Sequence, residues 1–125
     1  MKIKVLHAED DLVFSRIVRR ILPPSDFEVY HACDGEQAWE LFTKMNFHYC
    51  LLDIMMPRLG GIDLGERIRN TDKEVPICYL SAEELVLVEQ EVFGRGGGTA
   101  FFNKTFNINK LSLFLKQYFI TNPIR

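Results

Sequence analysis

The chain has 125 residues, of which 47% are hydrophobic and 26% charged, and its formal net charge is -2. This composition predicts one soluble globular domain that buries its core without metal or disulfide staples. The charge is too close to neutral for a nucleic-acid-binding surface, and no apolar run approaches the roughly 20 residues of a membrane span. We therefore expect neither direct nucleic-acid binding nor a place in the membrane.

The N-terminal segment gives no indication of export. Its apolar stretch is broken by His7 and stops at three acidic residues, 9–11, so it lacks the apolar core of a signal peptide. We expect a cytoplasmic protein. The three cysteines are odd in number and have no metal-ligand spacing, which favours reduced thiols in that compartment.

Short apolar runs alternate with segments of helical period along the whole chain. This pattern is typical of βαβ units, in which helices cover both faces of a parallel sheet. The predicted strands are 3–8, 28–32, 49–52, 77–80 and 100–103. Apolar residues at three- and four-residue steps predict helices over 13–22, 34–45, 62–68, 85–92 and 107–118, with Asp34 and Asn107 as candidate N-caps. We expect residues 1–125 to form a single domain, with no effector domain.

Polar side chains follow four of the five predicted strands. The acidic residues 9–11 follow the first strand, Asp53 the third, Ser81 the fourth and Lys104 the fifth. Each has an ordinary structural explanation, since an aspartate or serine can cap a helix and a lysine can lie in solvent. Because the carboxyl ends of parallel strands form the ligand-binding edge of an open sheet, their joint occurrence favours a functional site.

The chemistry that this set supports is phosphoryl transfer to a carboxylate. Clustered carboxylates repel one another, and Mg²⁺ relieves that repulsion while it also binds phosphate oxygens. Asp53 can then act as the nucleophile and form an aspartyl phosphate. The Lys104 ammonium and the Ser81 hydroxyl would help to neutralise the charge on the transferring group.

Four segments together resemble the receiver domain of two-component response regulators. These are KVLHAEDD at the first strand, YCLLDIMMPRLGG around the third, ICYLSA at the fourth and AFFNKTF at the fifth. The resemblance covers essentially the whole chain and implies the CheY-like, flavodoxin-like (βα)₅ fold, a doubly wound parallel sheet of strand order 2-1-3-4-5. It also implies a donor, either a sensor histidine kinase or a histidine phosphotransfer protein.

The resemblance assigns a role to each matching residue. It makes Asp53 the phosphoacceptor and a ligand of Mg²⁺, together with Glu9, Asp10 and the backbone carbonyl of Met55. Asp10 is the expected direct ligand of the acidic pair, and Glu9 is expected to act through water.

Three further residues match the family's catalytic and switching positions. Ser81 matches the hydroxyl residue that moves to bond the phosphoryl group, and Lys104 matches the lysine that pairs with that group. Phe101 matches the aromatic residue that turns inward as the hydroxyl moves. The fourth helix, fifth strand and fifth helix would form the surface that changes.

The sequence departs from the family pattern after Lys104. The family usually has a proline there, joined by a cis peptide bond, whereas this chain has Thr105. A cis bond before a non-proline residue costs about 2.5–4 kcal/mol, so we expect a trans bond. The pair Thr99 and Ala100 replaces an acidic pair used for dimerisation in one DNA-binding subfamily, which weakens the case for that dimer.

The positions of two cysteines suggest that they are neighbours. Cys50 lies three residues before Asp53, and Cys78 lies three residues before Ser81. On adjacent parallel strands in matching register, both would point to the same face of the sheet. We expect two neighbouring thiols in the core.

Two other functions compete with the phosphorylation switch. One is a protein-interaction module that keeps the fold and works without phosphorylation, which the Thr105 departure favours. The other is a small-molecule phosphohydrolase with an aspartyl-phosphate intermediate. Such enzymes generally need a second carboxylate two residues past the nucleophile to act as acid and base, and this chain has Met55 there.

Overall fold

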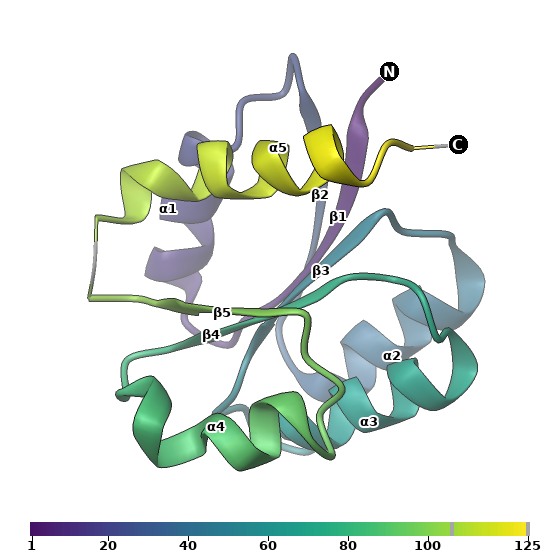
Figure 1. Ribbon diagram of the computed structural model, residues 1–125, viewed down its shortest axis with the longest axis vertical. Coiled ribbons are helices and arrows are strands. Elements are labelled where there is room, and N and C mark those ends of the chain that lie inside the picture. The colour runs from purple at the N-terminus through teal and green to yellow at the C-terminus, as the bar shows by residue number, and fades with distance from the viewer. Residues whose placement is uncertain (106, 125) are drawn as a thin grey trace.

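A computed structural model of the protein describes residues 1–105 and 107–124. Its five parallel strands form one sheet of order β2-β1-β3-β4-β5, which confirms the predicted flavodoxin-like topology (Figure 1). The strands are β1 Ile3–Ala8, β2 Phe27–Ala32, β3 Tyr49–Asp53, β4 Ile77–Ser81 and β5 Ala100–Asn103. The helices are α1 Leu12–Ile21, α2 Gly35–Lys44, α3 Gly61–Thr71, α4 Leu85–Phe93 and α5 Leu111–Thr121, and a 3₁₀ turn, η1 Ile108–Lys110, precedes α5.

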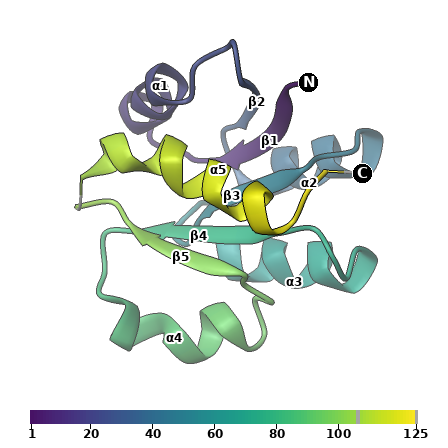
Figure 2. The same ribbon diagram turned by 45° about the horizontal axis from the view of Figure 1, so that its top comes forward.

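The helices cover the sheet in two layers. Helices α1 and α5 lie on one face, and α2, α3 and α4 lie on the other (Figures 1 and 2). Each face has its own apolar core, with Val18 and Leu115 under α1 and α5, and Ala38, Ile68 and Val92 under the other three helices. The central strands are buried on both sides, which explains why β3 and β4 are apolar up to their final residue.

Side-chain caps start the first two helices. The Asp11 carboxylate accepts hydrogen bonds from the backbone N–H groups of Val13 and Phe14, at 2.9 and 3.1 Å. Asp34 accepts one from Gln37 at 2.8 Å, as predicted. These bonds satisfy N–H groups that a helix leaves free in its first turn. Because Asp11 takes the capping role in α1, the carboxylates of its two acidic predecessors are available elsewhere.

The prediction that Cys50 and Cys78 share a face of the sheet is wrong. Cys50 pairs with Ile77, and Cys78 pairs with Leu51, so the two cysteines are offset by one residue. Side chains alternate along a strand, so this offset sends them to opposite faces. Both are free thiols, as expected, and burial raises the pKa of each to about 12.

Two residues lie outside the part of the chain that the structure describes. They are Phe106, the last residue of the AFFNKTF segment, and Arg125. Within residues 1–105 and 107–124, no helix has the length and apolar character needed to cross a membrane.

Candidate functional site

The sheet register brings the predicted site residues to one edge. Ala8 of β1 pairs with Leu52 of β3, so Glu9, which follows β1, and Asp53, the last residue of β3, lie side by side at this edge. On the next pair of strands, Ser81 lies opposite Asn103, and Lys104 follows directly. Parallel pairing therefore places all of these side chains above the carboxyl ends of the strands.

Three carboxylates form a cluster at this edge. Glu9, Asp10 and Asp53 each offer an oxygen within 4.8 Å of the others. Glu9 has no solvent exposure and Asp53 is 6% exposed, whereas Asp10 is exposed. The backbone N–H of Asp11 donates a hydrogen bond to Glu9 Oε2 at 3.2 Å. The cluster thus has a buried floor and one side open to solvent.

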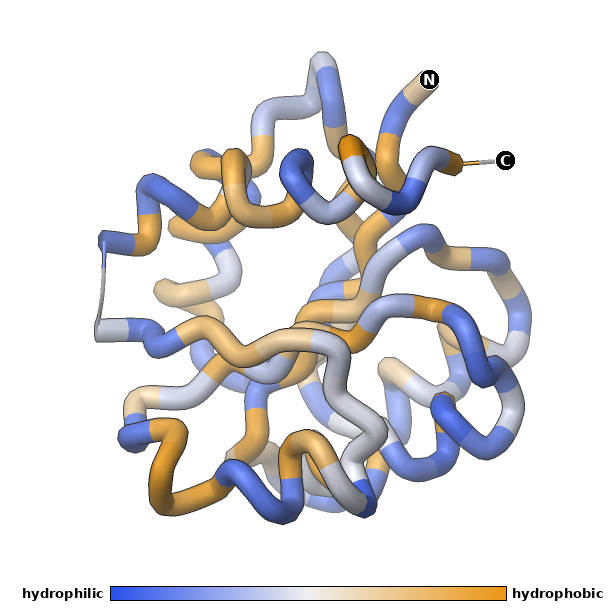
Figure 3. Tube along the Cα trace, in the orientation of Figure 1, coloured by the Kyte–Doolittle hydropathy of each residue, from blue (hydrophilic) through white to orange (hydrophobic). Residues whose placement is uncertain are grey.

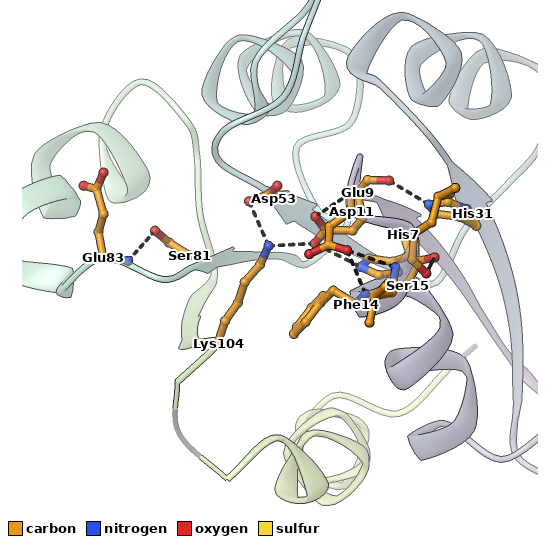
Figure 4. Close-up of polar contacts among 12 residues, drawn as sticks. His7, Glu9, Asp11, Phe14, Ser15, His31, Asp53, Ser81, Glu83 and Lys104 are labelled. Atoms are coloured by element: carbon orange, nitrogen blue, oxygen red, sulfur yellow. Dashed lines mark hydrogen bonds and ion pairs between the residues drawn. The ribbon is translucent and has the colours of Figure 1, made fainter.

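Lys104 points into the cluster, although it comes from the far strand. Its ammonium nitrogen lies 2.8 Å from Glu9 Oε1 and 3.3 Å from Asp53 Oδ1 (Figure 4). The same nitrogen lies 4.5 Å from the centre of the Phe14 ring on α1. A cation over an aromatic face is stabilised by the ring quadrupole. Phe14 and the two carboxylates therefore hold the ammonium from different sides.

The crowding of charge shifts the ionisation of Asp53. Burial and the neighbouring Glu9 carboxylate raise the pKa of Asp53 to about 7, and the Lys104 ammonium opposes part of that rise. Burial alone would lower the pKa of Lys104, but the hydrogen bond and charge of Glu9 and the charge of Asp53 raise it overall. A cation added to this site would favour the ionised form of Asp53.

The donor set fits Mg²⁺. Carboxylate oxygens are the hard ligands that this ion prefers, and it binds through one or two carboxylates while it retains several waters. Glu9, Asp10 and Asp53 supply such oxygens on the partly open side of the cluster. The thioether of Met55 is a soft ligand that does not suit Mg²⁺, so any contribution from that residue comes from its main-chain carbonyl.

The two predicted switch residues lie outside the cluster. Ser81 is 4% exposed, and its hydroxyl oxygen accepts a hydrogen bond from the backbone N–H of Glu83 at 3.0 Å (Figure 4). Within residues 1–105 and 107–124, no hydrogen bond joins Ser81 to Asp53. Phe101 is half-buried, pairs with Tyr79 in the sheet and packs against the core beneath α2, α3 and α4.

Sequence reasoning missed a buried histidine behind the cluster. His7 has no solvent exposure, and its Nε2 lies 3.9 Å from Glu9 Oε1. Its ring centre lies 6.4 Å from that of Phe14 and 5.8 Å from that of His31. Burial and the charges of His31, Lys104 and Arg19 lower its pKa to about 3, so it is neutral. A lone histidine within an apolar strand carries no sequence signal for such a position.

Sequence reasoning also missed Asn103, which precedes Lys104 and which it treated only as the last residue of a strand. It is buried, and its side chain forms hydrogen bonds with the main chain of Glu83, after β4, and of Thr105, after β5. The one available sequence signal is the asparagine two residues before Thr105, a spacing typical of a side-chain-to-backbone turn. The bond between Lys104 and Thr105 is trans, as expected.

Comparison with known sequences relates the chain to one family. The family described as the response regulator receiver domain matches residues 5–116. The transcriptional regulatory protein CrdR of Helicobacter pylori is 27% identical over 125 residues, which cover 99% of this chain and 58% of CrdR. RprY of Bacteroides fragilis is 29% identical over 89% of this chain and 47% of its own length. The chain thus spans about half the length of the curated relatives it matches.

Comparison with solved structures agrees. The chemotaxis response regulator CheY4 of Vibrio cholerae has a TM-score of 0.85 and 28% identity, covering 94% of this chain and 98% of CheY4. The response regulator TrrA of Thermotoga maritima, solved in complex with Mg²⁺-BeF, has a TM-score of 0.82 and 25% identity, with coverage of 94% and 98%. Both similarities extend over nearly the whole of each chain.

Proposed function

This chain belongs to the response regulator receiver domain family, and from that premise we propose that it is a switch driven by phosphorylation of Asp53. The donor is a phosphohistidine on a sensor histidine kinase or a histidine phosphotransfer protein. The observation that carries the proposal is the position of Asp53, which lies at the end of β3 beside two further carboxylates and 3.3 Å from the Lys104 ammonium.

The reaction forms one bond and breaks one. A carboxylate oxygen of Asp53 attacks the phosphorus, a new P–O bond forms, and the P–N bond to the donor histidine breaks. The departing imidazole keeps the electron pair of that bond and takes a proton from solvent. Asp53 must be ionised to attack, and Lys104 favours that form because it lowers the pKa of Asp53. Lys104 also carries positive charge toward the negative phosphoryl oxygens.

Glu9, Asp10 and Asp53 hold the metal ion in this proposal, together with the main-chain carbonyl of Met55. Bound Mg²⁺ supplies charge neutralisation and orientation for the phosphoryl oxygens. Two properties of the chain support the assignment. The three carboxylates already lie within 4.8 Å of one another, and burial beside Glu9 raises the pKa of Asp53 in the absence of a divalent cation.

The signal leaves the site through Ser81 and Phe101. In the phosphorylated state the Ser81 hydroxyl donates a hydrogen bond to the phosphoryl group, and the Phe101 ring moves inward. The output surface consists of α4, β5 and α5. Large apolar side chains on both helices support this choice, and the start of α4 is hydrophobic over consecutive residues (Figure 3). Exposed members include Val86 at 77%, Leu87 at 72%, Leu113 at 57% and Ile120 at 77%.

Phosphorylation by acetyl phosphate tests the proposal. The full chain is incubated with acetyl phosphate and MgCl₂, and intact mass spectrometry measures the addition of one phosphoryl group. We expect modification of the wild type and of Asp63→Asn, a matched change at an exposed aspartate on α3. We expect none for Asp53→Asn or in the presence of EDTA.

An unmodified wild type would contradict the switch and favour the alternative, an interaction module that works without phosphorylation. The Lys104 ammonium already balances part of the acidic charge, which suits either function. The two functions predict different effects of Asp53→Ala on the affinity of the chain for a captured partner. Unchanged affinity favours the interaction module, and loss of phosphate-dependent affinity favours the switch.

A further inference from the structure

Asn103 forms hydrogen bonds with the turns on both sides of it. It is the last residue of β5, 8% exposed, and it directly precedes Lys104. Its Nδ2 donates a hydrogen bond to the carbonyl oxygen of Glu83 at 3.1 Å. Its Oδ1 accepts hydrogen bonds from the backbone N–H of Thr105, at 2.8 Å, and from the Thr105 hydroxyl. Both ends of this one amide are therefore used.

The first turn that Asn103 binds is the turn that carries Ser81. The Ser81 hydroxyl accepts the N–H of Glu83, and Asn103 binds the carbonyl of the same residue. The backbone N–H of Lys104 also donates to the Ser81 carbonyl at 2.8 Å. The turn after β4 is thus joined to the chain around Lys104 by hydrogen bonds from two consecutive residues.

The second turn begins the segment beyond β5. Asn103 Oδ1 binds residue 105, so the main chain is fixed on both sides of Lys104. A lysine side chain loses roughly 2 kcal/mol of rotamer entropy when it is held in one position. The Lys104 side chain is only 17% exposed and reaches Glu9 and Asp53. Because the main chain at Lys104 is already fixed, holding the ammonium at the two carboxylates costs less conformational entropy.

We propose that Asn103 is a positioning residue, which fixes the Lys104 main chain against the Ser81 turn and so holds the ammonium at the carboxylates. The coupling to switching rests on the proposed function. Movement of Ser81 toward a phosphoryl group breaks its bond to the Glu83 N–H. Because Asn103 is hydrogen-bonded to the Glu83 carbonyl, this movement also displaces the contact that links the Ser81 turn to the main chain at Lys104.

Chemical labelling of lysines tests the positioning without phosphorylation or metal. The full chain in EDTA is treated briefly with an amine-acetylating reagent, and peptide mass spectrometry compares acetylation of Lys104 with that of exposed Lys110. Asn103→Leu removes all the side-chain bonds at nearly constant size. We expect its Lys104 to react on the order of fivefold faster, the effect of losing about one net hydrogen bond. Equal reactivity in wild type and variant would overturn the proposal.

Two further variants serve as a control and as a substitute in this test. Asn46→Leu makes the same change at an exposed asparagine between α2 and β3, at the opposite edge of the sheet, and should leave Lys104 reactivity unchanged. Circular dichroism checks that Asn103→Leu is folded. If it is not, Thr105→Val removes only the hydroxyl donor, and we expect a smaller increase, about twofold. No increase in that folded variant would overturn the proposal.

A double-mutant cycle asks whether Asn103 acts through Lys104. With acetyl phosphate and Mg²⁺, Asn103→Leu should slow phosphorylation, and Lys104→Met should slow it more. In the Lys104→Met background, Asn103→Leu should have no further effect, because residues that act through one another are not additive. Equal slowing in both backgrounds would refute the positioning role. A wild type that is not phosphorylated refutes the proposed function alone, and the labelling result still decides the role of Asn103.

Discussion

The ammonium nitrogen of Lys104 lies 2.8 Å from Oε1 of Glu9, a carboxylate with no solvent exposure. This contact places a monovalent cation at the carboxylates that we assign to a divalent one. Positive charges this close repel each other, by about 4 kcal/mol per pair of unit charges at 4 Å and an effective dielectric constant of 20. Lys104 and Mg²⁺ should therefore compete for the cluster.

Removal of the lysine charge should strengthen metal binding. We expect Lys104→Met to bind Mg²⁺ on the order of tenfold more tightly, because relaxation and screening leave only part of the Coulomb repulsion. The Asp53 pKa is about 7 with Lys104 present, and loss of the ammonium raises it further, so isothermal titration calorimetry is repeated at increasing pH above about 8 until the affinity of each protein no longer changes. Lys110→Met, an exposed lysine in η1, is the control. Weaker or unchanged binding by Lys104→Met would contradict the competition.

His7 should make stability depend on pH. Its pKa is lowered from 6.5 to about 3, mainly by burial, so the unfolded chain binds a proton more readily than the folded one. The contribution of neutral His7 to the free energy of unfolding is therefore fully present above pH 6.5, and it is lost as the pH falls from 6.5 toward 3. Asp53 has the opposite effect, because its raised pKa of about 7 means that the folded state binds the extra proton. The two groups partly cancel in the wild type.

A substitution separates the two contributions. His7→Leu removes the titrating ring from the core. When the pH falls from about 6.5 to 5, the free energy of unfolding of the variant should therefore decrease by about 2 kcal/mol less than that of the wild type. Urea unfolding in EDTA at several pH values measures this difference. His48→Leu, at a half-buried histidine at the opposite edge of the sheet, should show a smaller difference. Parallel stability profiles for the wild type and His7→Leu would contradict the assigned ionisation.

Arg58 has a strained backbone in the loop after β3. Its φ is +67°, a conformation that favours glycine, and its Nε lies 2.9 Å from the Asp34 carboxylate. Arg58→Val should destabilise the fold by about 1–2 kcal/mol, because a β-branched side chain fits this conformation poorly. Arg58→Gly removes the same exposed ion pair but relieves the strain. Urea unfolding should rank the glycine variant above the valine variant, and equal stabilities would exclude strain.

Gly65 is required by a buried tyrosine. A Cβ at this position would lie 1.7 Å from the Tyr79 hydroxyl oxygen, which donates a hydrogen bond to the Gly96 carbonyl at 2.6 Å. Gly65→Ala should cost about 2–3 kcal/mol from overpacking. In a Tyr79→Phe background the cost should be smaller, because the nearest atom is absent.

Urea denaturation of the four proteins in this cycle gives the coupling energy. Gly60→Ala is the control, because its Cβ would meet only one atom, the Ile54 carbonyl oxygen at 3.6 Å, and it should change stability little. Additive costs for Gly65→Ala and Tyr79→Phe would show that the alanine is resisted not by the hydroxyl but by atoms that both backgrounds keep, such as the Tyr79 ring carbon Cζ at 2.8 Å and the Gly96 carbonyl oxygen at 2.9 Å.

The pattern of the sequence was sufficient for the elements and for the edge at which the site lies, and the resemblance to receiver domains supplied the strand order. Alternating apolar runs and helical periods predicted every strand and helix, with strand boundaries within one residue. Residues such as Asp53 and Lys104 could be assigned to one edge because parallel strands all end on the same side of a sheet. That inference needs only the order of the elements along the chain.

Tertiary structure alone decided which of these residues touch. A shift of one residue between β3 and β4 placed Cys50 and Cys78 on opposite faces. The same kind of long-range register, together with the path of the chain after β5, brought Lys104 to Glu9 and placed Asn103 between two turns. Local patterns specify which face of a strand is buried, but pairing between distant segments sets the register. A side chain's partners change completely with a shift of one residue.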